Sequence, residues 1–294
     1  MTAYSDLGKK TTNEMIEPLR EKMIGRELMY VNTRISDKAL DSIEAFEYSD
    51  LGDALIKRGL PDDTIFRDGL RTATHTVLLN TIVEGFLLER QEFNNYVNNG
   101  IPIDTTIAMV AADKVAEKEN EAALVGWSLD GTVYTQEGMK ELTGKSTEST
   151  SKDFGTFGYP LDKTILAIDV LNDAGVYADS YNLTLNKTQY GELRSSISTT
   201  GESEWDLVMG ALNEGGSSMG KIRKSSDVTA ASGFLTPVDP TGKYFQMYET
   251  YSPTASFGYD SKLGEEDSPV YGKVYERVGF DWKQPTAVCY ISAI

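Results

Sequence analysis

A chain of 294 residues with 40% hydrophobic and 10% aromatic residues can bury a core and is long enough for two domains. Its formal net charge of −17 argues against tight, sequence-independent binding to nucleic acid, which needs clustered Lys and Arg. That charge does not exclude a protein that encloses nucleic acid without gripping it. The sequence has no apolar run of about 18 residues and no secretory signal, so we expect a soluble chain that is not secreted by that route.

One cysteine and one histidine restrict the chemistry open to this chain. Cys289 excludes an internal disulfide and a cysteine-rich metal site, and its context, AVCYI, favours a small buried residue in a strand. His75 alone excludes sites built from several histidines, and the sequence has no Gly-x-Ser-x-Gly motif, so a structural or surface role is favoured over catalysis. We therefore predict no catalytic, cofactor-binding or metal-binding residue and no enzyme activity.

The N-terminal part of the chain favours an extended structure over a compact one. Residues 1–16 show no hydrophobic period, and the sequence after them favours a short helix that ends at Gly25. Residues 28–34 and 43–48 have extended character and are separated and followed by polar, turn-rich sequence. An excursion of this length with so few apolar residues can hardly bury itself, so we expect it to find support on another surface.

The middle of the chain predicts strands followed by two helices. Residues 72–88 are rich in β-branched and large apolar residues, which predicts one or two buried strands. Within 89–126, the Asn-Gly pair at 99–100 ends a first helix. Asp104 is a good N-cap for a long, Ala-rich second helix that extends to Val125. A helix of about 22 residues is about 33 Å long, enough to span a small domain.

Residues 143–158 are rich in Ser, Thr and Gly and predict a mobile loop or linker. The sequence then predicts a helix that Asp162 caps and Gly175 ends, a short strand at 181–185, and two short helices, of which the second starts at Ser203. Two further strands are predicted at the positions 243–251 and 270–282. The last has alternating faces, with Val270, Val274, Val278, Phe280 and Trp282 on one and Tyr271, Lys273, Tyr275, Arg277 and Asp281 on the other.

Two polar patterns resemble functional motifs without matching one. The segment GGSSMG at 215–220 lacks the residues of a phosphate-binding loop, so a helix end and turn are favoured. Glu117, Glu119 and Glu121 are interpreted as a solvated helix face. None of the carboxylate clusters has the spacing of a calcium loop; they are Asp62/Asp63, Glu117/Glu119/Glu121 and Glu265/Glu266/Asp267.

The order of these elements resembles the major capsid protein fold of tailed viruses, the HK ninety-seven type, which encapsulin shells share. The segment 89–126, ERQEFNNYVNNGIPIDTTIAMVAADKVAEKENEAALVG, resembles the short helix and the spine helix of that family. MIGRELMYV at 23–31 resembles its N-terminal helix and first strand, and YNLTLNKTQYGEL at 181–193 resembles its axial domain. VYERVGFDWKQPTAVCYI at 274–291 resembles its final peripheral strands. The resemblance therefore extends over nearly the whole chain.

The resemblance implies an α+β fold with four parts. These are an N-terminal arm at 1–27, an extended loop at 28–71, a peripheral domain at 72–158 and 260–294 with a spine helix at about 104–125, and an axial domain at 159–259. It also implies a homo-oligomer that assembles through pentamers and hexamers into an icosahedral shell around double-stranded DNA. The implied location is the virion, with assembly in the host cytoplasm. Portal, decoration or scaffolding proteins are the further partners of such shells, and no membrane is involved.

Two alternatives stay open at this point. An encapsulin shell would enclose a protein cargo and would carry an inner hydrophobic patch, for which Met15, Ile16, Leu19 and Met23 are candidates or else ordinary helix core. A carboxylate-dependent hydrolase of α+β fold would instead need a pocket with at least two acidic side chains of perturbed pKa.

Overall fold

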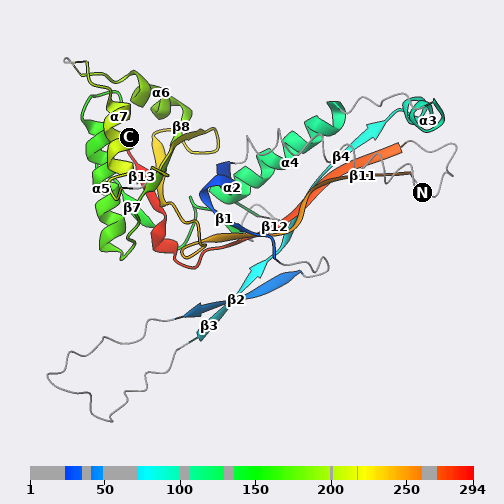
Figure 1. The fold of residues 1–294 in the computed structure, drawn as a ribbon, viewed down its shortest axis with the longest axis horizontal. Helices are drawn as coiled ribbons and strands as arrows, with labels where there is room; N and C mark the ends of the chain where they lie inside the picture. The colour runs from blue at the N-terminus through cyan, green and yellow to red at the C-terminus, as the bar shows by residue number, and fades with distance from the viewer. Residues whose placement is uncertain are drawn as a thin grey trace, which may run out of the picture.

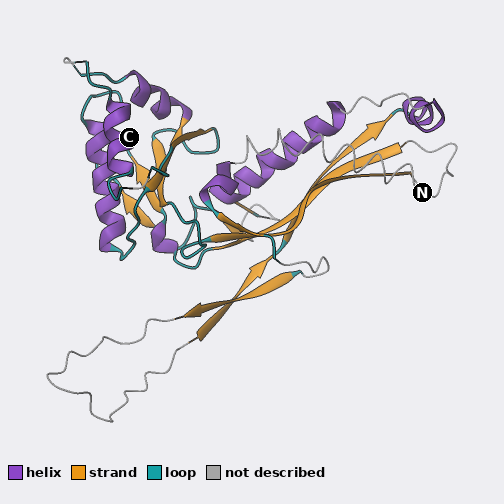
Figure 2. Ribbon diagram, in the orientation of Figure 1, coloured by secondary structure: helices purple, strands orange, loops and turns teal. Residues whose placement is uncertain are grey.

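The computed structural model describes residues 24–34, 41–48, 72–99, 106–128, 136–198, 201–216, 218–259 and 270–294. The expected arm at 1–16, the N-cap Asp104, and the clusters Asp62/Asp63 and Glu265/Glu266/Asp267 lie outside these residues, as do Met15, Ile16, Leu19 and Met23. The described elements form two main sheets, each packed against helices, and a separate hairpin (Figures 1 and 2).

The first sheet has four strands in the order β1-β11-β12-β4. Its centre is β12 (Val270–Asp281), which pairs antiparallel with β11 (Gln246–Tyr259) and with β4 (Asn80–Leu88). A short strand, β1 (Tyr30–Asn32), pairs in parallel with β11. The sheet thus joins segments from the start, the middle and the end of the chain.

One long helix, α4 (Thr106–Leu124), runs along one face of this sheet without a break (Figure 1). Small side chains let the helix lie close to the strands, and Ala108, Ala111 and Ala112 pack with Val274 of β12. The predicted second helix is confirmed as a single helix. The first predicted helix is α3 (Arg90–Asn99), which ends at the Asn-Gly pair as expected.

A five-residue helix, α2 (Ile24–Leu28), packs on α4 near its C-terminal end. Gly25 lies inside this helix, so the prediction that it ends a helix is wrong. A Cβ at Gly25 would lie 2.7 Å from the Cβ of Ala123, which explains why the position needs glycine: α2 and α4 are in direct contact there.

A two-stranded hairpin projects away from both main sheets (Figure 1). It consists of β2 (Ser42–Tyr48) and β3 (Thr72–Leu78), which are antiparallel over their whole length. The predicted hairpin-like excursion is therefore present, but its return strand is β3, from the segment that was predicted to be buried. A small two-stranded ladder, β5 (Gly126–Trp127) with β6 (Gln136–Glu137), follows α4.

The second sheet has five strands in the order β7-β13-β10-β8-β9, and helices α5, α6 and α7 pack around it. Its strands are β7 (Ser146–Glu148), β13 (Cys289–Ser292), β10 (Ser232–Pro237), β8 (Tyr181–Asn186) and β9 (Ile222–Ser225). Its helices are α5 (Tyr159–Asp173), α6 (Lys187–Ser195) and α7 (Glu204–Leu212), and a short 3-10 helix, η1 (Pro285–Ala287), precedes β13. The buried side chains of this part include Phe234, Leu183 and Leu171.

Two local predictions in this part are wrong for the same reason, a partner far away in the sequence. The segment 143–158 is not a linker, because β7 pairs with β13 and Phe154 is fully buried. Asp162 lies in the first turn of α5 and is not its cap. The carboxylate of Glu204, on α7, accepts hydrogen bonds from the backbone N–H groups of Gly158 and Leu161 instead, both at 2.9 Å.

Candidate assembly surface

The face of the first sheet opposite α4 carries large apolar side chains that the described residues leave open to solvent. On β4, Val83 is 55% exposed and Leu87 is 57% exposed, although residues 72–88 were predicted to be buried. Tyr271 of β12 is 44% exposed and pairs with Leu87 in register. These side chains are exposed despite the predicted burial because every second residue of a strand faces away from α4.

Two more tyrosines extend this surface onto the central strands. Tyr275 of β12 pairs with Val83, and its ring packs edge-on against that of Tyr251 on β11 with centroids 5.6 Å apart. The ammonium group of Lys273 lies 5.4 Å from the Tyr275 ring centroid. We call Val83, Leu87, Tyr251, Tyr271 and Tyr275 the open sheet face. Because exposed apolar side chains gathered on one face are typical of interaction sites, we treat this face as the candidate assembly surface.

The hairpin is anchored to the first sheet next to this face. His75 Nε2 lies 2.7 Å from Asp281 Oδ1, and Arg277 donates to Asp41 Oδ1 at 2.6 Å. Asp281 is buried and also accepts from Gln246 Nε2 at 3.0 Å. Burial and the neighbouring Asp281 carboxylate raise the pKa of Tyr248, which also bonds Asp281, to about 12. His75 thus contacts a buried carboxylate, which agrees with the structural or surface role that the sequence favoured.

Four charged side chains meet between α2, α4 and the first sheet. Arg26 is 3.0 Å from Glu119 Oε2, 2.8 Å from Glu249 Oε2 and 3.2 Å from Glu276 Oε2. Glu119 is 1% exposed, so the interpretation of residues 117 to 121 as a solvated face fails for Glu119.

The spacing of Glu119 relative to three alanines in the sequence indicates that its side chain is buried. Glu119 follows Ala112 by seven residues and Ala116 by three, and Ala123 follows it by four. All four side chains therefore lie on one stripe of the helix, and the three alanines are buried. Glu117 is exposed as expected and pairs with Lys114, whereas Glu121 is half-buried and pairs with Lys118.

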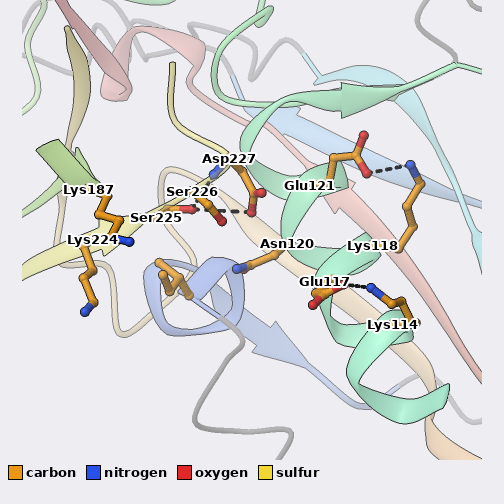
Figure 3. A pocket seen from close by; sticks show the side chains of 11 residues that line it. Lys114, Glu117, Lys118, Asn120, Glu121, Lys187, Lys224, Ser225, Ser226 and Asp227 are labelled. Carbon is orange, nitrogen blue, oxygen red and sulfur yellow. Dashed lines mark hydrogen bonds and ion pairs between the residues drawn. The ribbon is translucent and has the colours of Figure 1, made fainter. Parts of the chain in front are cut away.

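A cleft of about 800 Å³ separates α4 from β9 and α6 (Figure 3). Lys187 and Lys224 lie on one side, and the Lys114 and Lys118 pairs with their glutamates lie on the other (Figure 3). Burial, and then Glu121 and Glu117, raise the pKa of Asp227, while a hydrogen bond from Ser225 opposes this. The lining mixes both signs of charge, so it favours neither an anion nor a cation.

The described residues offer no metal-binding group of three or more His, Cys, Asp or Glu side chains. Residues 213–216 form the turn after α7, as predicted for the Gly-rich segment. Cys289 is fully buried in β13, as predicted. None of the described helices is both long and apolar enough to cross a membrane.

The long helix on one sheet, the second sheet with its helices and the projecting hairpin together define the capsid fold of the HK ninety-seven type. Residues 66–216, just over half of the chain, match the Linocin_M18 family, described as encapsulating protein for peroxidase. The chain belongs to this family. The expected fold class and the resemblance are thereby confirmed.

Solved structures share this fold at low sequence identity. A virus-like particle from Pyrococcus furiosus is 15% identical with a TM-score of 0.62, covering 97% of this chain and 98% of that one. The capsid of Myoviridae phage XM1 is 12% identical with a TM-score of 0.68, covering 92% of each chain. The capsid of a native GTA particle is 16% identical with a TM-score of 0.61, covering 92% of this chain and 89% of that one. No curated protein sequence matches the chain.

Proposed function

We propose that this chain is the structural subunit of a closed icosahedral shell, built by copies of itself through pentamers and hexamers, and that it has no catalytic activity. The observation that carries the proposal is the open sheet face beside a hairpin that leaves the body of the subunit (Figure 1). A surface of this kind on a chain with a capsid fold is best explained by burial against a second copy.

The hairpin suggests which surfaces of two neighbouring subunits meet in the proposed interface. A two-stranded hairpin alone in water is marginally stable at best, so β2 and β3 need a surface to lie on. The hairpin of one subunit would cover a neighbour, as the resemblance implies, while its own sheet accepts the hairpin of another. Such a contact joins two different surfaces, and contacts of this type generate rings when the rotation closes.

We propose double-stranded DNA as the content of the shell, in a virion that assembles in the host cytoplasm. The capsids of phage XM1 and of the GTA particle, which share the fold, support this choice. The net charge of −17 supports a container that holds DNA weakly and releases it. Portal, decoration or scaffolding proteins would complete such a particle.

A protein cargo is the second candidate, and the family description, encapsulating protein for peroxidase, favours it. The two contents differ in what purifies with the particles. DNA that resists nuclease until the particles are opened supports the virion, whereas a second protein in a fixed ratio and no protected DNA supports the encapsulin shell.

The division of the chain into four parts remains a proposal, and the sheet pairings change which strands we assign to each part. The arm is proposed at 1–27 and the extended loop at 28–71, continued into β3, except that β1 joins the first sheet. The peripheral domain would hold the first sheet and α4, and it would include β11, which pairs with β12. The axial domain would hold the second sheet and would include β7 and β13, which pair with each other.

Sedimentation of the purified full chain tests the assembly proposal. The expected species is a particle of many 32.4 kDa subunits. Val83→Lys with Leu87→Lys puts charge on the open sheet face and is expected to leave small oligomers or monomers. Lys114→Ala on the exposed side of α4 is the matched control and should assemble normally. A monomer in the unmodified chain, or full assembly of the double variant, would contradict the proposal.

A further inference from the structure

The strand β4 forms one edge of the first sheet and is open to a further strand on its outer side. It pairs with β12 on its inner side, and the sheet order β1-β11-β12-β4 ends with it. Among the described residues, the backbone of residues 81–88 has no strand partner other than β12. Every second residue of an edge strand points its N–H and C=O groups outward, so β4 presents a row of unpaired donors and acceptors.

The opposite edge of the same sheet is protected against such pairing. On that side β11 contains Pro253, which lacks an N–H group, and its register with β12 shifts twice between Glu249 and Thr254. Proline and bulges are two means by which edge strands avoid pairing with another chain. β4 has neither, because it contains no proline and its register with β12 is unbroken over its nine residues.

Gly85 lies in the middle of β4, and the described part of its own subunit gives no reason for a glycine there. A Cβ at this position would meet the Gly272 carbonyl oxygen at an ordinary 4.0 Å, and the backbone has no positive φ. Glycine weakens a strand and often marks a place where another backbone approaches closely. A neighbour from outside the subunit would explain Gly85.

A second copy of β4 is complementary to this edge when the two strands run antiparallel with Gly85 opposite Gly85. In that register Val83 lies opposite Leu87, on the open sheet face. On the other face, Ile82 lies opposite Leu88. Apolar side chains therefore meet across the two strands on both faces, and such cross-strand pairs stabilise a sheet.

The charge on β4 favours the same register. Glu84 is the one charged residue of the strand, and with Gly85 at the centre it lies opposite Phe86. A pairing centred one residue earlier would place two Glu84 carboxylates opposite each other, which is unfavourable. We propose that β4 pairs with β4 of a second copy across a two-fold axis at Gly85, which joins their two first sheets into one continuous sheet.

This contact differs from that of the hairpin. A two-fold contact uses the same surface of both copies, whereas the hairpin contact joins two different surfaces. The strands meet edge to edge in the plane of the sheet, so the open sheet face stays available to the hairpin. The pairing itself needs no shell, but its role in one rests on the proposed function, in which it would join one ring of subunits to the next.

A cysteine at Gly85 tests the pairing, because opposed residues of antiparallel strands are close enough for a disulfide. Gly85→Cys adds an exposed thiol to a chain whose Cys289 is fully buried. Mild oxidation of the purified full chain should give disulfide-linked dimers on a non-reducing gel. Thr81→Cys, exposed on the same face of β4, is the matched control. Its two copies would lie about 26 Å apart, so its dimers should be rarer by about tenfold or more.

A mixture of two further variants keeps the proposal testable if Gly85→Cys does not fold. Val83→Cys and Leu87→Cys should form few dimers when each is oxidised alone. Refolded together from denaturant, they should cross-link to each other, because residue 83 of one copy lies opposite residue 87 of the other. Dimers no more abundant for Gly85→Cys than for Thr81→Cys, or no gain on mixing, would overturn the edge pairing.

Sedimentation of the same samples separates this result from the proposed function. Particles without the cross-link at position 85 would refute the edge pairing and leave the shell in place. Cross-linked dimers without particles would support the edge pairing and contradict the shell.

Discussion

His75 Nε2 lies 2.7 Å from Asp281 Oδ1, and this contact ties the return strand of the hairpin to the last residue of the central strand β12. The two residues are separated by 206 positions, and Asp281 is buried while His75 is partly exposed. The contact fixes the base of the hairpin at one edge of the open sheet face. The chain's one histidine therefore serves the geometry of the proposed interface.

Replacement of this histidine should loosen the hairpin. In His75→Ala the buried Asp281 carboxylate loses one partner, which is expected to cost about 1–3 kcal/mol and to speed hydrogen exchange in β2 and β3. Thermal unfolding and exchange mass spectrometry measure the two effects. Thr76→Ala, at an exposed position of the same strand, is the control. Equal stability of His75→Ala and the control would show that the contact does not anchor the hairpin.

The contact of α2 with α4 predicts that replacement of glycine by alanine changes folding stability differently at Gly25 and at Gly191. Gly25→Ala places a Cβ 2.7 Å from Ala123, which should displace α2 and destabilise the chain by about 1–3 kcal/mol. Gly191→Ala, in α6, meets nothing within 4 Å and should be neutral or stabilising by up to about 1 kcal/mol. Denaturant unfolding of both variants checks the difference. A Gly25→Ala variant as stable as the unmodified chain would mean that α2 does not pack on α4 as described.

Lys163 and Glu148 form a buried ion pair, and we expect a loss of folding stability when one charge is removed and the other remains. Lys163 is fully buried, 3.3 Å from Glu148 Oε1, and also donates to the Thr150 carbonyl. Lys163→Met leaves a poorly solvated carboxylate and should cost about 3–5 kcal/mol, measured by denaturant unfolding. Adding Glu148→Gln should recover most of that loss.

A surface ion pair of the same kind is the control for Lys163. Lys152 pairs with Asp162 at 3.5 Å, with the Asp162 side chain 56% exposed. Lys152→Met should cost less than about 1 kcal/mol. Equal costs at Lys152 and Lys163 would contradict the assigned difference in burial.

Cys289 should be inert in the folded chain. Burial, and then the nearby Glu148 charge, raise the pKa of its thiol to about 12, and the thiolate is the reactive form. The neutral thiol thus favours the fold at ordinary pH, and this contribution is lost as the pH rises towards that value. A thiol-reactive dye at pH 8 should label no native chain and one site per chain in denaturant. Rapid labelling of the native chain would place Cys289 at the surface.

Local sequence patterns were enough to predict the elements that depend on local properties. The alanine-rich segment predicted α4 because helix propensity and an apolar stripe act over neighbouring residues. Alternation predicted β12 from Val270, where β12 begins, and Cys289 was correctly predicted in a buried strand. The family resemblance added the order of the parts, which propensity alone does not give.

The sequence-based predictions that the structure contradicts concern contacts between residues far apart in the sequence. Burial of Glu119 depends on Arg26, 93 positions away, and the start of α5 is capped by Glu204, 43 and 46 positions away. β7 forms a strand because β13 lies beside it. The exposure of Val83 and Leu87 has a different origin. Their apolar character predicted burial, and we propose that a second copy of the chain provides it.

Electron microscopy of the purified full chain, in negative stain and then in ice, tests the central claim most directly. The account predicts closed, hollow particles of icosahedral symmetry, in which the hairpin of each subunit lies on the sheet of its neighbour and Val83 and Leu87 are covered. A compact monomer at every concentration and salt, or particles in which this face stays open to solvent, would contradict it.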